Sequence, residues 1–143
     1  MIKLKSLICE GLNLNPLTTF QQLRHAKTIT CYHASESPNF EAYDHPLHVG
    51  SFQQATSLIR NMKSHNPELK YYVYEMEISL ESLPNFLFDE DPDVDPNIAK
   101  HDSYAYSNRI EFPQGIHQGT NISVVIMNPK KQILSKKIVY TSK

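Results

Sequence analysis

The ten residues YYVYEMEISL, residues 71–80, alternate between two kinds of side chain and decide the predicted fold. A β-strand places successive side chains on opposite faces of its sheet, so the alternation predicts a strand with one face in the core. The predicted core face carries Tyr72, Tyr74, Met76, Ile78 and Leu80. The predicted outer face carries Tyr71, Val73, Glu75, Glu77 and Ser79. We interpret Glu75 and Glu77 as solvent-facing strand residues and not as a catalytic carboxylate pair.

Two helices and two short strands are predicted before this strand. Helical spacing favours a helix over residues 18–26, and β-branched and aromatic residues favour a strand over 28–33. A second strand is expected over 47–50. Ser51 is a suitable N-cap for a helix that follows it, and Asn66 with the next proline ends that helix.

The downstream half is predicted to contain a long loop followed by short strands. Residues 84–103 are rich in proline and acidic side chains, a composition that favours a solvated loop with one short helical turn. Strands are expected over 122–127, 133–134 and 137–140. Helices and strands do not alternate regularly, which favours an α+β fold over a doubly wound sheet.

Length and composition indicate one domain over residues 1–143, with 1–27 as an entry segment. The 14 basic and 15 acidic residues give a formal charge of −1, so no strong field attracts nucleic acid or an anionic membrane. The sequence has two cysteines and no apolar run near twenty residues. We therefore expect a cytoplasmic protein in a reducing compartment, without a membrane or nucleic-acid partner.

Two groups of residues resemble metal sites, but their spacing is unfavourable. Alternating aspartates over 89–95 lack the glycine and glutamate positions of a calcium loop. Cys31, His33, His45 and His48 include a C-x-H pair, whereas structural zinc ligands are usually two to four residues apart. We expect no metal in either place.

Three separated fragments place polar residues where the chain leaves a predicted strand, which is where binding sites are commonly built. The first is YHAS, residues 32–35, and the second is LHVGS, residues 47–51. The third is YSNRIE, residues 106–111, followed by SVVIMNP, residues 123–129. Taken singly, each fragment also has a plain structural interpretation.

Together, the fragments resemble the motifs of the ADP-ribosyltransferase superfamily over about residues 28–134. This resemblance implies split, mixed and antiparallel β-sheets flanked by a few helices. It also implies a transferase that cleaves NAD at the nicotinamide-ribose bond and passes ADP-ribose to a macromolecular acceptor, most simply a protein. Small members often occur as phage proteins, toxins or effectors, so host cytoplasm is a second compatible location.

The resemblance also assigns roles to residues of this sequence. Glu111 takes the place of the catalytic acid, because a carboxylate can stabilise the oxocarbenium-like ribose. Arg109 and Asn108 take the acceptor-facing positions, and Arg109 argues against arginine as the acceptor. The residues assigned to NAD binding are Tyr32, His33, Ala34, His48, Gly50 and Ser51.

The sequence departs from the family pattern at two of these positions. His48 stands where a tyrosine usually stacks on nicotinamide, and Ala34 replaces a glycine. These departures leave an alternative open, in which the chain is a degenerate member that binds or inhibits a protein. A related RNA 2′-phosphotransferase activity is less favoured, because the sequence lacks the basic character that RNA binding requires.

Overall fold

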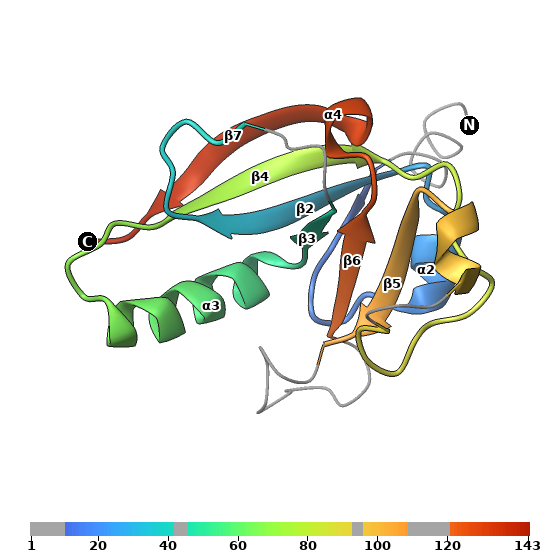
Figure 1. Ribbon diagram of the computed structural model, residues 1–143, viewed down its shortest axis with the longest axis horizontal. Helices are drawn as coiled ribbons and strands as arrows, with labels where there is room; N and C mark the ends of the chain where they lie inside the picture. The colour runs from blue at the N-terminus through green and yellow to red at the C-terminus, as the bar shows by residue number, and fades with distance from the viewer. Residues whose placement is uncertain (1–10, 42–45, 93–95, 109–120) are drawn as a thin grey trace, which may run out of the picture.

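The computed structural model describes residues 11–41, 46–92, 96–108 and 121–143 and contains two β-sheets (Figure 1). The first sheet has the order β1-β2-β4-β7, and the second has the order β3-β6-β5. β1 pairs with β2 in parallel, and the other strand pairs are antiparallel. The strands are β1 (Leu12–Asn13), β2 (Thr28–Ser35), β3 (Leu47–Val49), β4 (Tyr72–Ser79), β5 (Ser103–Ser107), β6 (Ile122–Ile126) and β7 (Ile133–Thr141). This arrangement confirms the predicted α+β class.

The helices are short except for the one beneath the first sheet (Figure 1). They are α2 (Phe20–His25), α3 (Phe52–His65), α4 (Pro129–Gln132) and the 3-10 helix η1 (Pro96–Lys100). α3 packs against β2 and β4, and its expected start after Ser51 and end at Asn66 are confirmed. None of the helices in the described ranges has the length and hydrophobicity needed to cross a membrane.

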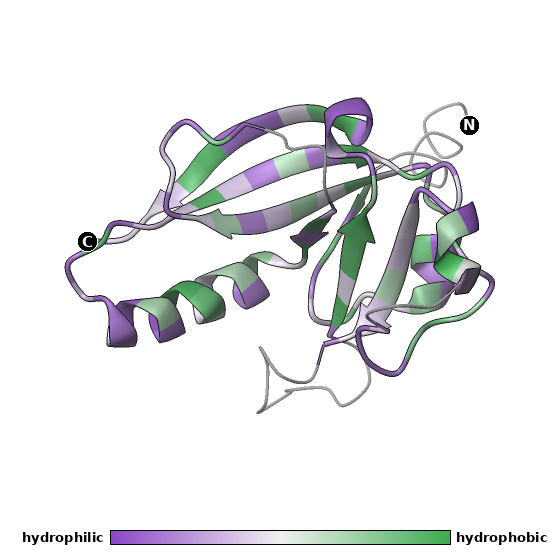
Figure 2. Ribbon diagram, in the orientation of Figure 1, coloured by the Kyte–Doolittle hydropathy of each residue, from purple (hydrophilic) through white to green (hydrophobic). Residues whose placement is uncertain are grey.

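The main core lies between the two sheets. Ile29, Met76, Ile78, Val124 and Ile126 are fully buried there, so the predicted core face of residues 71–80 is confirmed. Figure 2 shows β6 as a largely hydrophobic strand, because it is buried on both faces. Hydrophilic residues lie at the C-terminal end of α3 in the same view.

The outer face of β4 differs from its prediction. Tyr71 and Val73 are buried, because Ala55 and Ile59 of α3 pack over this end of the sheet. Glu75 lies further along the strand, where it accepts a hydrogen bond from the Tyr32 hydroxyl at 3.3 Å and forms an ion pair with Lys137 at 3.5 Å. Only the more distant Glu77 is exposed as expected.

Among the described residues, one bridge of backbone hydrogen bonds joins the two sheets, between Tyr32 inside β2 and Gly50 at the end of β3. The Tyr32 N–H donates to the Gly50 carbonyl at 2.8 Å, and the Gly50 N–H donates to the Tyr32 carbonyl at 3.0 Å. The bridge brings β2 and β3 together just before Ser51 starts α3. Two predicted fragments that are distant in the sequence therefore meet at one place.

Other differences concern the edges of the sheets. β1 and β5 were not predicted, and the expected pair of strands after 133 is the single strand β7, which pairs with β4 through two shifts in register. The short helical turn expected within 84–103 is η1, whereas the bridge from Phe88 in the same loop to Tyr106 of β5 was not expected. These short strands and register shifts depend on pairing with neighbouring strands. A local sequence pattern therefore does not predict them.

Candidate functional site

A pocket of about 80 Å³ lies where β2 and β3 meet the first turns of α3. At roughly 10–15 Å³ per water, this space suits a single small ring and not a whole dinucleotide. Five of the six residues that sequence reasoning assigned to NAD binding line it, and Ser51 lies beside it as the N-cap of α3. The lining residues are Tyr32, His33, Ala34, His48, Val49, Gly50, Gln54, Ala55, Leu58, Tyr106 and Ser123.

His33 lines the pocket and has one ring nitrogen that can accept a hydrogen bond. Its Nδ1–H donates to the backbone carbonyl of His48 at 2.9 Å, which leaves Nε2 as the unprotonated nitrogen of the neutral ring. Burial lowers the pKa of His33, so the ring is neutral at pH 7. A neutral Nε2 can accept a hydrogen bond from a ligand hydroxyl.

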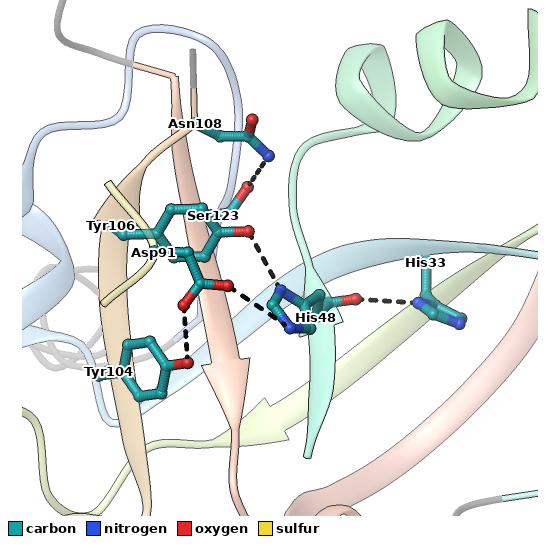
Figure 3. Close-up of polar contacts among 7 residues, drawn as sticks. All are labelled: His33, His48, Asp91, Tyr104, Tyr106, Asn108 and Ser123. Carbon is teal, nitrogen blue, oxygen red and sulfur yellow. Dashed lines mark hydrogen bonds and ion pairs between the residues drawn. The ribbon is translucent and has the colours of Figure 1, made fainter. Parts of the chain in front are cut away.

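His48 belongs to a polar network that the sequence did not predict (Figure 3). Its Nδ1 shares a hydrogen bond with the Tyr106 hydroxyl at 3.1 Å, and its Nε2 lies 3.9 Å from Oδ2 of Asp91. The Tyr104 hydroxyl donates to the other oxygen of Asp91 at 3.1 Å. Contacts with β5 and β3 therefore hold both the imidazole and the carboxylate in defined positions.

The contacts of Asp91 differ from the prediction of a solvated acidic loop. Phe88 N–H donates to the Ala105 carbonyl at 3.2 Å, and the Phe88 ring packs on Tyr104 with centroids 5.9 Å apart. These contacts hold the loop against β5, and Asp91 in that loop lies 3.9 Å from the pocket-lining His48. Residues 93–95 of the acidic run lie outside the described residues.

Gly50 makes room for a neighbouring side chain. A Cβ at this position would lie 1.9 Å from Oε1 of Gln54. That oxygen accepts a hydrogen bond from the Ser51 N–H at 2.8 Å, and the Ser51 hydroxyl accepts one from the Gln54 N–H at 3.1 Å. The missing Cβ thus allows the Gln54 amide to fold back over the start of α3, a role that sequence reasoning did not assign.

Asn108 and Ser123 connect the third fragment to the pocket (Figure 3). The buried Asn108 amide donates from Nδ2 to the pocket-lining Ser123 hydroxyl at 2.9 Å, and its backbone N–H donates to the Asn121 carbonyl at 2.8 Å. Asn108 therefore makes internal contacts at the end of β5. The predicted catalytic Glu111 and the predicted acceptor-facing Arg109 lie outside the described residues.

The residues considered for zinc take part in other contacts. The Cys31 thiol is buried, donates to the Met76 carbonyl at 3.8 Å, and has a raised pKa because burial disfavours the thiolate. His45 lies outside the described residues. Across the four described ranges, no group of three or more metal-ligating side chains comes together.

The described site therefore combines a neutral histidine acceptor, a second imidazole held by a tyrosine and a carboxylate, and a glutamine amide around a ring-sized space. Such a site can hold a planar group and fix the hydroxyls attached to it. No family model, no curated protein and no solved structure matches this chain.

Proposed function

We propose that this protein is an NAD-dependent mono-ADP-ribosyltransferase, an enzyme of the glycosyl-transfer class with a macromolecular acceptor, most simply a protein. The observation that carries the proposal is the convergence of separate fragments on one pocket. Residues 32–34 and 48–50, together with Tyr106 and Ser123, line the same space. These residues come from all three fragments that resemble the superfamily motifs. The two sheets joined at Tyr32 and Gly50 are also compatible with an ADP-ribosyltransferase-like fold.

The chemistry of the pocket suits one end of NAD. The volume of about 80 Å³ accommodates the nicotinamide ring, while the rest of the dinucleotide extends over the open surface. Neutral His33 offers Nε2 to a ribose hydroxyl, and this contact is worth about 1 kcal/mol. His48 and Tyr106 supply aromatic surface beside the ring.

Glu111 is the proposed catalytic acid. In the reaction, the bond between ribose C1′ and the nicotinamide nitrogen breaks, and the neutral leaving group keeps the bonding electrons. A carboxylate near the resulting oxocarbenium-like ribose stabilises its positive charge until a nucleophilic atom of the acceptor bonds to C1′ and releases its proton to solvent. Glu111 follows Asn108 by three residues in the sequence, and Asn108 is hydrogen-bonded to pocket-lining Ser123.

A second candidate function is a degenerate member that binds or inhibits a protein without turnover. The observation that favours it is the engagement of His48 by Tyr106 and Asp91, because these contacts restrain the imidazole in the position where the superfamily stacks a tyrosine. Under this alternative NAD transfer is absent while the fold is unchanged. A cytoplasmic location, including the cytoplasm of a host, is compatible with both proposals.

Glu111→Gln tests the proposed enzyme. We expect a loss of transfer of labelled ADP-ribose to lysate proteins of at least about 10²-fold, because the neutral amide cannot stabilise the charged transition state. NAD affinity, measured by thermal shift, should change little. The matched control is Glu77→Gln, which removes an exposed carboxylate from β4 and should leave both quantities unchanged. Wild-type transfer by Glu111→Gln would show that another residue is the acid, and the absence of transfer by wild type would favour the degenerate alternative.

A further inference from the structure

The orientation of the Gln54 side-chain amide is fixed by its own helix. Oε1 must face the Ser51 N–H, which donates to it at 2.8 Å, because a side-chain nitrogen cannot accept that hydrogen bond. This assignment makes Nε2 the amide atom that does not face the Ser51 N–H. Gly50 permits this orientation, since a Cβ there would lie 1.9 Å from Oε1.

Nε2 of Gln54 is a buried donor that lacks an acceptor among the described residues. The residue is 3% exposed and lines the pocket. Buried donors in folded proteins nearly always have a partner, so an unpartnered one beside a pocket calls for an acceptor that the described residues do not supply. A second capping box, formed by Thr19 and Gln22, lies at an exposed helix start.

We propose that Gln54 is a specificity-determining residue, whose Nε2 donates a hydrogen bond to a carbonyl oxygen carried by the ring in the pocket. The ligand class is a planar ring bearing a carboxamide or another carbonyl acceptor. The proposal rests on the proposed function and deepens it, because it names the protein group that selects the substituted ring over an unsubstituted one. Gln54 lies at the start of α3, where the partial positive charge of the helix N-terminus also favours a hydrogen-bond acceptor on the ligand.

Gln54→Glu isolates the donor. Glutamate replaces glutamine in capping boxes, so the carboxylate can still accept from the Ser51 N–H while no donor remains. We expect nicotinamide to bind at least about tenfold more weakly to this variant, because its carbonyl would face a carboxylate oxygen. Binding of 3-methylpyridine, which has the ring but no carbonyl, should change by less than about twofold by the same reasoning. Both affinities can be measured by NMR titration.

Gln22→Glu is the matched control, because it makes the same change in the exposed capping box of α2. It should alter neither affinity. A second measurement needs no variant: in wild-type protein, nicotinamide should shift the side-chain NH₂ resonances of Gln54, and 3-methylpyridine should leave them nearly unchanged. This measurement keeps the proposal testable if Gln54→Glu does not fold.

The outcomes separate this proposal from the proposed enzyme. The role of Gln54 would be overturned if Gln54→Glu lowered the affinities for both ligands equally or lowered neither. It would also be overturned if nicotinamide did not bind to wild type. If NAD is turned over but Gln54→Glu binds nicotinamide normally, the enzyme stands and the specificity role is wrong. If nicotinamide binding depends on Gln54 but ADP-ribose transfer is absent, the specificity role stands and the enzyme proposal fails.

Discussion

Replacing Gly50 with alanine should destabilise the protein by displacing the Gln54 amide. The backbone at Gly50 does not have the positive φ that favours glycine, so alanine brings no backbone strain. Its Cβ would instead lie 1.9 Å from Oε1 of Gln54, and the amide must move away. The buried Ser51 N–H then loses its acceptor.

The expected cost follows from that one hydrogen bond. An unsatisfied buried donor costs about 1–3 kcal/mol, and loss of a helix cap costs about 0.5–2 kcal/mol. Alanine also lowers the conformational entropy of the unfolded chain, which raises the free energy of unfolding by about 0.4–1 kcal/mol. We therefore expect Gly50→Ala to lower the free energy of unfolding by about 1–2 kcal/mol.

A double-mutant cycle with Gln54→Ala shows whether the two residues act through this contact. In the Gln54→Ala background the obstructing amide is absent, so Gly50→Ala should stabilise the protein by about 0.4–1 kcal/mol, and the coupling between the two substitutions should be about 2 kcal/mol. Urea denaturation of the wild type, the two single variants and the double variant measures all four free energies of unfolding. Additive effects within about 0.3 kcal/mol would refute the proposed clash.

Two further predictions follow from buried titratable groups. Burial lowers the pKa of His33, so below about pH 6.5 the unfolded chain takes up a proton that the folded protein does not, and the free energy of unfolding falls. Urea unfolding at pH 7.5 and 5.5 should show a larger loss for wild type than for His33→Gln, and equal losses would contradict this cause. Burial raises the pKa of Cys31, so in a Cys9→Ser background a thiol reagent should modify Cys31 far more slowly in native protein than in urea. Equal rates in the two conditions would show that the thiol is accessible.

Local sequence patterns were sufficient for the elements that carry strong periodicity. The alternation over 71–80 identified β4 and its core face, and Ser51 identified the start of α3. Five of the residues assigned to NAD binding lie around one pocket. The strand expected over 28–33 continues to Ser35, so Tyr32, His33 and Ala34 lie inside β2, and they reach the pocket through the bridge to Gly50 and not because a strand ends there.

The remaining features depend on contacts between distant segments. β5 consists of small and aromatic residues that are buried on both faces, so its five residues show no alternation. Asp91 lies close to His48 because Phe88 attaches its loop to β5 and the Tyr104 hydroxyl donates to its carboxylate. The capping pattern predicts the acceptor role of Gln54 Oε1, but it carries no information on what surrounds Nε2. Tyr71 and Val73 are buried by α3, which a strand pattern alone cannot show.

The strand order of the first sheet has a consequence for how the chain folds during synthesis. β4 lies between β2, which precedes it, and β7, which is the last strand along the chain, with Tyr72 paired to Thr141. A nascent chain can pair β2 with β4 and cover them with α3 well before β7 leaves the ribosome. Until then, one edge of β4 has unpaired backbone groups and is open to pairing with other chains. The interval between translation of β4 and β7 is therefore the stage at which this protein is most exposed to misassembly.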